Sequence, residues 1–83
     1  MENRIALIGI IVTDVSQSTK LNALLSEYGQ YIIGRMGLPH HRHEDKELAI
    51  ISVAIEAPQN SISALSGKLG MLEGVSAKVI YAG

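Results

Sequence analysis

Near its start the chain reads Arg4-Ile5-Ala6-Leu7-Ile8-Gly9-Ile10-Ile11-Val12, and this segment is the strongest indication of the fold. Its aliphatic residues, many of them β-branched, occupy both odd and even positions, which is typical of a strand covered on both faces. A second stretch of the same kind runs from Leu48 to Ile55. We therefore expect two long strands, both central in a sheet.

Two other segments have the spacing of amphipathic helices. Their apolar positions are Leu21, Leu24, Leu25 and Tyr28 in the first, and Ile62, Leu65, Leu69 and Leu72 in the second. Ser16 or Ser18 is available as the N-cap of the first helix, and Gly29 as its stop. Tyr31 to Leu38 is predicted to be an edge strand, and Val75 to Tyr81 a terminal strand.

The element order is βαββαβ, which predicts an α+β, ferredoxin-like domain over residues 1–83. In that arrangement two helices cover one face of a four-stranded antiparallel sheet. The other face is expected to be apolar as well, because both parities of the long strands are aliphatic. Burying four or five such side chains is worth on the order of 10 kcal/mol, so we expect self-association, as a dimer or tetramer, or a partner protein on this face.

Composition excludes several functions. With no cysteine there is no disulfide, no thiolate metal site and no cysteine nucleophile. A net charge of -1 provides no positive field for direct nucleic-acid binding. The longest apolar run, Ile5 to Val12, is too short to span a membrane, and a cytoplasmic location is expected.

The segment Gly34-Arg35-Met36-Gly37-Leu38-Pro39 has two glycines and a cation where a strand usually has β-branched residues. Bare backbone beside Arg35 would let an anionic ligand or a second subunit approach closely. Alternatively, glycine and charge protect an edge strand from uncontrolled pairing. Both readings remain open from the sequence.

His41 and His43 form an H-x-H pair within a polar stretch from His40 to Lys46 that is predicted as a hairpin tip. If the segment continues a strand, both imidazoles point to one face and could bind nickel or zinc. A third ligand would come from Glu44, Glu47 or another subunit. A solvated loop without metal is the favoured interpretation.

The chain has no G-x-S-x-G, H-E-x-x-H or Walker motif, so we do not expect an enzyme. The segment from Thr13 to Thr19 could receive an anion at the start of the first helix, but it lacks a glycine-rich phosphate loop. Helix capping is the favoured role of this segment.

Three segments resemble the family of proposed iron-only hydrogenase system regulators: residues 32–39 (IIGRMGLP), 62–70 (ISALSGKLG) and 74–78 (GVSAK). The likeness extends to the opening strand and to residues 24–29 (LLSEYG). It implies an ACT-like fold, similar to the C-terminal domain of the nickel-responsive repressor, and a regulatory role associated with hydrogenase maturation. We therefore expect an oligomeric, ligand-sensing regulatory domain, and a purely structural adaptor for hydrogenase assembly proteins is an alternative.

The chain departs from those relatives in three features. The glycine loop of ligand-binding ACT domains would fall near residues 14–19, which contain no glycine. The nickel repressor uses a cysteine beside its H-x-H pair, and this chain has none. The repressor's DNA-binding ribbon–helix–helix segment also has no counterpart in this chain, so we expect any transcriptional effect to need a partner.

Overall fold

The computed structural model describes residues 2–38 and 41–83. Its elements, in chain order, are β1 (Asn3–Val12), the 3₁₀ turn η1 (Val15–Gln17), α1 (Ser18–Glu27), the 3₁₀ turn η2 (Gly29–Tyr31), β2 (Ile32–Gly37), β3 (His41–His43), β4 (Lys46–Pro58), α2 (Gln59–Gly70) and β5 (Val75–Tyr81). The predicted α+β fold, with an antiparallel sheet and two helices, is confirmed.

The long strands are arranged in the order β2-β4-β1-β5, and every pairing is antiparallel. The two apolar strands, β1 and β4, are therefore central, and β2 is an edge strand as expected. The expected count of four strands is wrong, because β3 forms a fifth, short strand paired with β4.

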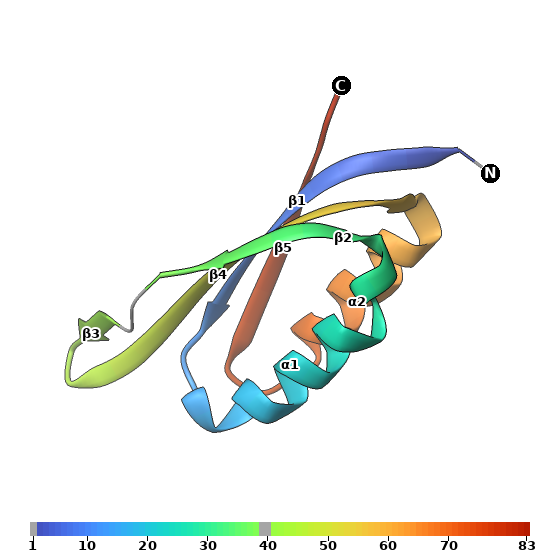
Figure 1. Ribbon diagram of the computed structural model, residues 1–83. Coiled ribbons are helices and arrows are strands. Elements are labelled where there is room, and N and C mark those ends of the chain that lie inside the picture. The colour runs from blue at the N-terminus through green and yellow to red at the C-terminus, as the bar shows by residue number, and fades with distance from the viewer. Residues whose placement is uncertain (1, 39–40) are drawn as a thin grey trace.

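Both helices lie on one face of the twisted sheet (Figure 1). Ala6, Ile8, Ile10 and Val12 of β1 point toward them and are buried. From the helices, the core receives Leu21, Leu25, Ile62, Leu65 and Leu69. The core is thus aliphatic, and the choice that the sequence left open is settled: the even positions of β1 face the helices.

The connection from β1 to α1 is held by a cap. Asp14 accepts hydrogen bonds from the Ser16 backbone N–H (3.1 Å) and hydroxyl (2.6 Å), and these bonds lower the pKa of the Asp14 carboxyl. The capping role predicted for this segment is confirmed, but the capping residue is Asp14, and Gln17 precedes α1 without a side-chain cap. Neither Ser16 nor Ser18 is the N-cap.

The β3–β4 hairpin extends beyond the part of the sheet that the helices cover, as an arm (Figure 1). Its turn residues, Glu44 and Asp45, both have positive φ, of 50° and 64°, as in the two-residue turns that match strand twist. The polar stretch predicted as a hairpin tip is therefore mostly paired strand, and only Glu44 and Asp45 form the turn.

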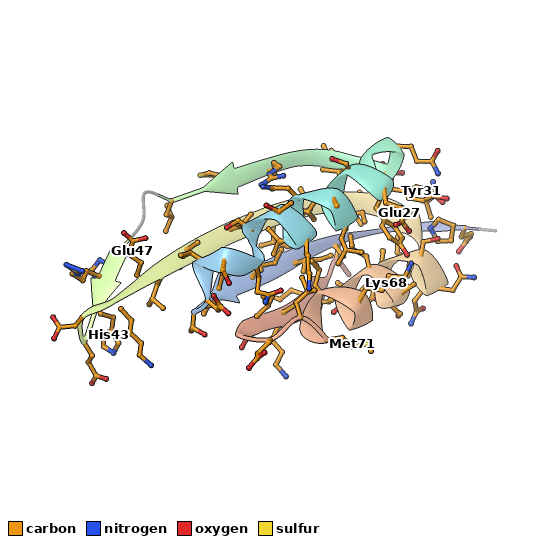
Figure 2. The ribbon with its side chains drawn as sticks, turned by 90° about the horizontal axis from the view of Figure 1, so that it is seen from below. Glu27, Tyr31, His43, Glu47, Lys68 and Met71 are labelled. Carbon is orange, nitrogen blue, oxygen red and sulfur yellow. The ribbon has the colours of Figure 1, made fainter. Side chains whose placement is uncertain are left out.

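On the outer surface, α1 and α2 are joined by an ion pair between Lys68 Nζ and Glu27 Oε2 at 3.2 Å. Hydrogen bonding to Tyr28, and next to Glu27, raises the pKa of Lys68. Figure 2 shows Glu27 and Lys68 near one another on the helical side, away from the arm. Within the described part of the chain, no helix is long and apolar enough to cross a membrane.

Gly74 in the turn before β5 has a conformation and a close neighbour that other residues would not tolerate. Gly74 has a φ of 73°, and a Cβ there would lie 2.7 Å from Asp14 Cβ. Gly74→Ala should lower the free energy of unfolding by about 1–3 kcal/mol in urea titrations, because it combines backbone strain with a clash. Gly70→Ala is the matched control, since a Cβ there meets no described atom within 4 Å, and it should not destabilise. Equal effects of both changes would contradict this account.

Candidate functional site

The face of the sheet opposite the helices, called the open face below, is the first candidate site. It consists of alternate residues of four strands, and five of them are large exposed hydrophobics: Ile5, Leu7, Ile11, Met36 and Ile80, with exposed fractions of 51%, 42%, 45%, 66% and 68%. Helices cover only the other face (Figure 1), so these side chains have no cover within the described chain. Single exposed hydrophobics are ordinary, but a continuous patch marks an interface.

Leu7 stands between two apolar hollows on this face. One, of about 270 Å³, lies toward β2 and is lined by Leu7, Gly34, Arg35, Met36, Ser52 and Ala54. The other, of about 300 Å³, lies toward β5 and is lined by Ile5, Leu7, Ala54, Ile80 and neighbouring backbone. Small residues of β2 and β4 form the floor of the first hollow, while large aliphatic ones protrude around both.

Gly9 deepens the centre of the open face. Its register partners are Ser52 and Lys78, so a small residue also lies beside it on β4. Among the described residues, no atom lies within 4 Å of a Cβ built on Gly9, and its φ is not positive. The monomer therefore gives no reason for glycine at a central strand position, where it costs stability, and close approach of an outside surface is the usual reason.

Glu56 and Lys78 are the charged residues that the register places around this apolar patch. Glu56 pairs with Ile5 and Lys78 with Gly9, so they flank β1 on opposite sides, two residues before and two residues after Leu7. Both are exposed. The two charges are thus arranged symmetrically about Leu7.

The segment predicted as a ligand or subunit site, Gly34 to Pro39, is divided between the two faces. Gly34 and Met36 pair with Ala54 and Ser52 and belong to the open face. Arg35 and Gly37 pair with Val53 and Ile51 and belong to the helical face, where Arg35 Nη2 donates a hydrogen bond to Asn22 Oδ1 at 3.1 Å.

Leu38 and Pro39 form the end of the predicted segment. The Leu38 N–H donates to the Ile50 carbonyl at 2.9 Å, which extends the pairing of the edge strand. Pro39 lies outside the described residues. A bulge between Ile32 and Gly34 shifts the register and so sets which of the two faces each later residue of β2 joins.

The two histidines of the predicted metal pair lie in β3, opposite Leu48 and Lys46. As alternate residues of one strand they share a face, the same one to which Leu48 and Ile50 belong. His43 Nε2 lies 3.9 Å from Glu44 Oε1, and both side chains are exposed. Among residues 2–38 and 41–83, no group of three or more metal-binding side chains is gathered. The structure thus places both histidines on one face of β3, and among the described residues no third metal-binding side chain gathers with them.

Sequence reasoning missed Gly9, Asn22, Glu56 and Lys78. Gly9 carried a signal, because a glycine inside an otherwise β-branched strand is a marked exception. Asn22, Glu56 and Lys78 are ordinary polar surface positions in the sequence. Their importance depends on register and on the contact between α1 and β2, which the sequence does not reveal.

Comparisons with known proteins place the chain in a family. A model of the TM1266-like family, described as proposed iron-only hydrogenase system regulators, matches residues 4–79. The solved structure of the uncharacterized protein TM1266 from Thermotoga maritima is 30% identical, with a TM-score of 0.87, over 99% of this chain and 100% of that one. Among curated proteins, none matches this chain.

Two more distant structures show the fold alone. CPII from Thiomonas intermedia K12, bound to ADP, AMP and acetate, is 17% identical with a TM-score of 0.61, over 100% of this chain and 93% of its own. The divalent ion tolerance protein CutA1 from Ehrlichia chaffeensis is 10% identical with a TM-score of 0.50, over 99% and 84%. Likeness to the nickel-responsive repressor stays a prediction.

The family model spans nearly the whole chain, from β1 through most of β5, and the Thermotoga structure agrees with it end to end. This chain belongs to the TM1266-like family of proposed iron-only hydrogenase system regulators.

Proposed function

We propose that this chain is a small regulatory domain that works as a homo-oligomer, responds to a small ligand and performs no catalytic step of its own. The observation that supports it most directly is the open face, where protruding aliphatic side chains and two apolar hollows lie on one surface. A two-fold interface needs a self-complementary surface, and protrusions and hollows on one surface are what such an interface uses.

A second copy is the occupant that fits best. Ile5, Leu7, Ile11, Met36 and Ile80 protrude, and the hollows beside Leu7 are of a size to receive such side chains. The net charge of -1 opposes the meeting of two copies only weakly. An 83-residue domain also has a small core of its own, so burial of this face would add substantially to its stability.

The two charges on the open face suggest the symmetry of the assembly. Consider two copies packed face to face, with the two-fold axis running between them, over Leu7 and perpendicular to the line from Glu56 to Lys78. This axis places Glu56 of each copy opposite Lys78 of the other. Opposite charges at the rim of an apolar patch fix orientation more than they add affinity. We therefore expect the homodimer to be the smallest unit.

Ligand sensing is supported by the family and by the fold. The family is one of proposed regulators, and a CPII relative in fold is a nitrogen regulatory PII-like protein with bound nucleotides. A protein with a fold similar to this one can thus hold small ligands. Regulation without catalysis also agrees with the absence of recognisable catalytic motifs from the sequence.

The assembly is tested at Gly9. Gly9→Val should fold as well as the native chain, because the monomer has space for the side chain and valine favours strands. It should nevertheless weaken self-association roughly ten- to a hundredfold, since overpacking a contact costs about 1–3 kcal/mol. Sedimentation velocity over a concentration series measures this, with Gly67→Ala on α2 as the control. A dimer that tolerates valine at Gly9 would rule out this surface.

The orientation is tested by exchanging charges. Glu56→Lys or Lys78→Glu alone should weaken the dimer several-fold, because each change places like charges together. The double exchange, Glu56→Lys with Lys78→Glu, should restore affinity, and raising the salt concentration should reduce all of these differences. Additive losses in the double variant would contradict the proposed pairing.

A nickel- or zinc-binding module is the second candidate function, because the structure places His41 and His43 on one face of a strand. Titration calorimetry with Ni²⁺ and Zn²⁺ tests it. The His41→Ala/His43→Ala variant should lose at least about tenfold in affinity if both imidazoles bind. Arg42→Ala, between them and on the other face of β3, is the control, and unchanged binding by the double variant would eliminate this candidate.

A further inference from the structure

A pocket of about 220 Å³ lies on the helical side of the sheet, between α1 and the edge strand β2. Its inner wall is aliphatic, from Val12, Leu21 and Ile51, and its rim is polar, from Ser18, Asn22 and Arg35. It is separated from the open face by the sheet itself. Small-molecule sites usually combine apolar walls with converging polar groups, and in this pocket the polar groups make up the larger part of the accessible lining.

Gly37 leaves this pocket open. It pairs with Ile51, so a side chain at this position would point into the pocket. Its φ is not positive, and no described atom lies within 4 Å of a Cβ built there. Neither backbone geometry nor packing within the described chain requires glycine here, although a strand interior disfavours it. The missing side chain at Gly37 leaves this space free.

Arg35 gives the pocket its charge. Among the described residues, no carboxylate lies within 4.0 Å of its guanidinium, and its one hydrogen bond goes to Asn22 Oδ1 at 3.1 Å. That bond uses one of five N–H donors and leaves the Asn22 side-chain NH₂ available as a further donor. Asn22 thus holds the cation at the rim with most of its donors unoccupied.

We propose that this pocket binds a small carboxylate with a short, branched aliphatic part. The carboxylate accepts hydrogen bonds from Arg35 and Asn22, and the aliphatic part enters the space beside Gly37 and contacts Leu21 and Ile51. A guanidinium matches a carboxylate in charge and in planar geometry. The volume of about 220 Å³ suits a molecule of this size.

This inference supplies the ligand that the proposed regulatory role requires and in that respect rests on it. The pocket and the assembly surface nevertheless lie on opposite faces, and β2 contributes a glycine to each. Gly37 borders the pocket, whereas Gly34 borders a hollow of the open face. A substitution at each glycine can therefore separate the two functions.

The experiment is a titration of the ¹⁵N-labelled protein with 3-methylbutanoate, followed by amide chemical shifts. We expect saturable shifts at residues 18–22 and 35–38, with affinity in roughly the millimolar range for so small a probe. Arg35→Gln should reduce affinity at least about tenfold, since it removes a charge-assisted bond. The uncharged match, 3-methylbutan-1-ol, should bind at least about tenfold more weakly because it lacks the charge. Inorganic phosphate should also bind more weakly, because it has no aliphatic part to bury beside Gly37.

The glycine pair provides the matched variants. Gly37→Val should abolish the shifts without loss of thermal stability and without change in sedimentation. Gly34→Val should keep the shifts while weakening self-association. Binding of 3-methylbutanoate that survives Gly37→Val would overturn the proposal, as would equal binding of the alcohol or of phosphate. Failure of Gly34→Val to alter sedimentation would count against the assembly surface only.

Discussion

The antiparallel pairing of β1 with β4 is the constraint on which the rest of the structure depends. It runs without interruption from Asn3 opposite Pro58 to Val12 opposite Ala49 and joins the two most apolar segments of the chain. Because side chains alternate across a strand, this one pairing creates two apolar surfaces. One is buried under α1 and α2, and the other is the open face.

The edge strand β2 connects those surfaces to function. Its bulge at Ile32–Gly34 sets its parity, so that Arg35 and Gly37 face α1 while Gly34 and Met36 face outward. A shift of one residue would exchange the two pairs, placing the guanidinium in the apolar patch and methionine against Asn22. The same short strand thus borders the proposed ligand pocket and the proposed assembly surface.

The sequence predicted elements well where periodicity is strong and poorly where geometry is local. The aliphatic runs and the leucine spacing of both helices predicted the fold class. Aliphatic residues at both odd and even positions of β1 predicted the second apolar face. The cap was assigned to a serine because Ser16 and Ser18 suit that role, yet the chain turns earlier, at Asp14. The polar composition of residues 40–46 indicated a loop, whereas cross-strand pairing with β4 makes most of it strand. For the site, Gly34 and Arg35 were visible as exceptions, but their opposite directions depend on the bulge.

The central claim is that the open face is buried against a second copy of this chain, and intermolecular contacts test it most directly. In an isotope-filtered NOE experiment on a mixture of ¹³C-labelled and unlabelled protein, cross-peaks between copies arise only from protons in contact. The account predicts such peaks among the methyl groups of Ile5, Leu7, Ile11, Met36 and Ile80. Intermolecular peaks confined to helical residues such as Met71, or a protein that stays monomeric with none, would contradict it.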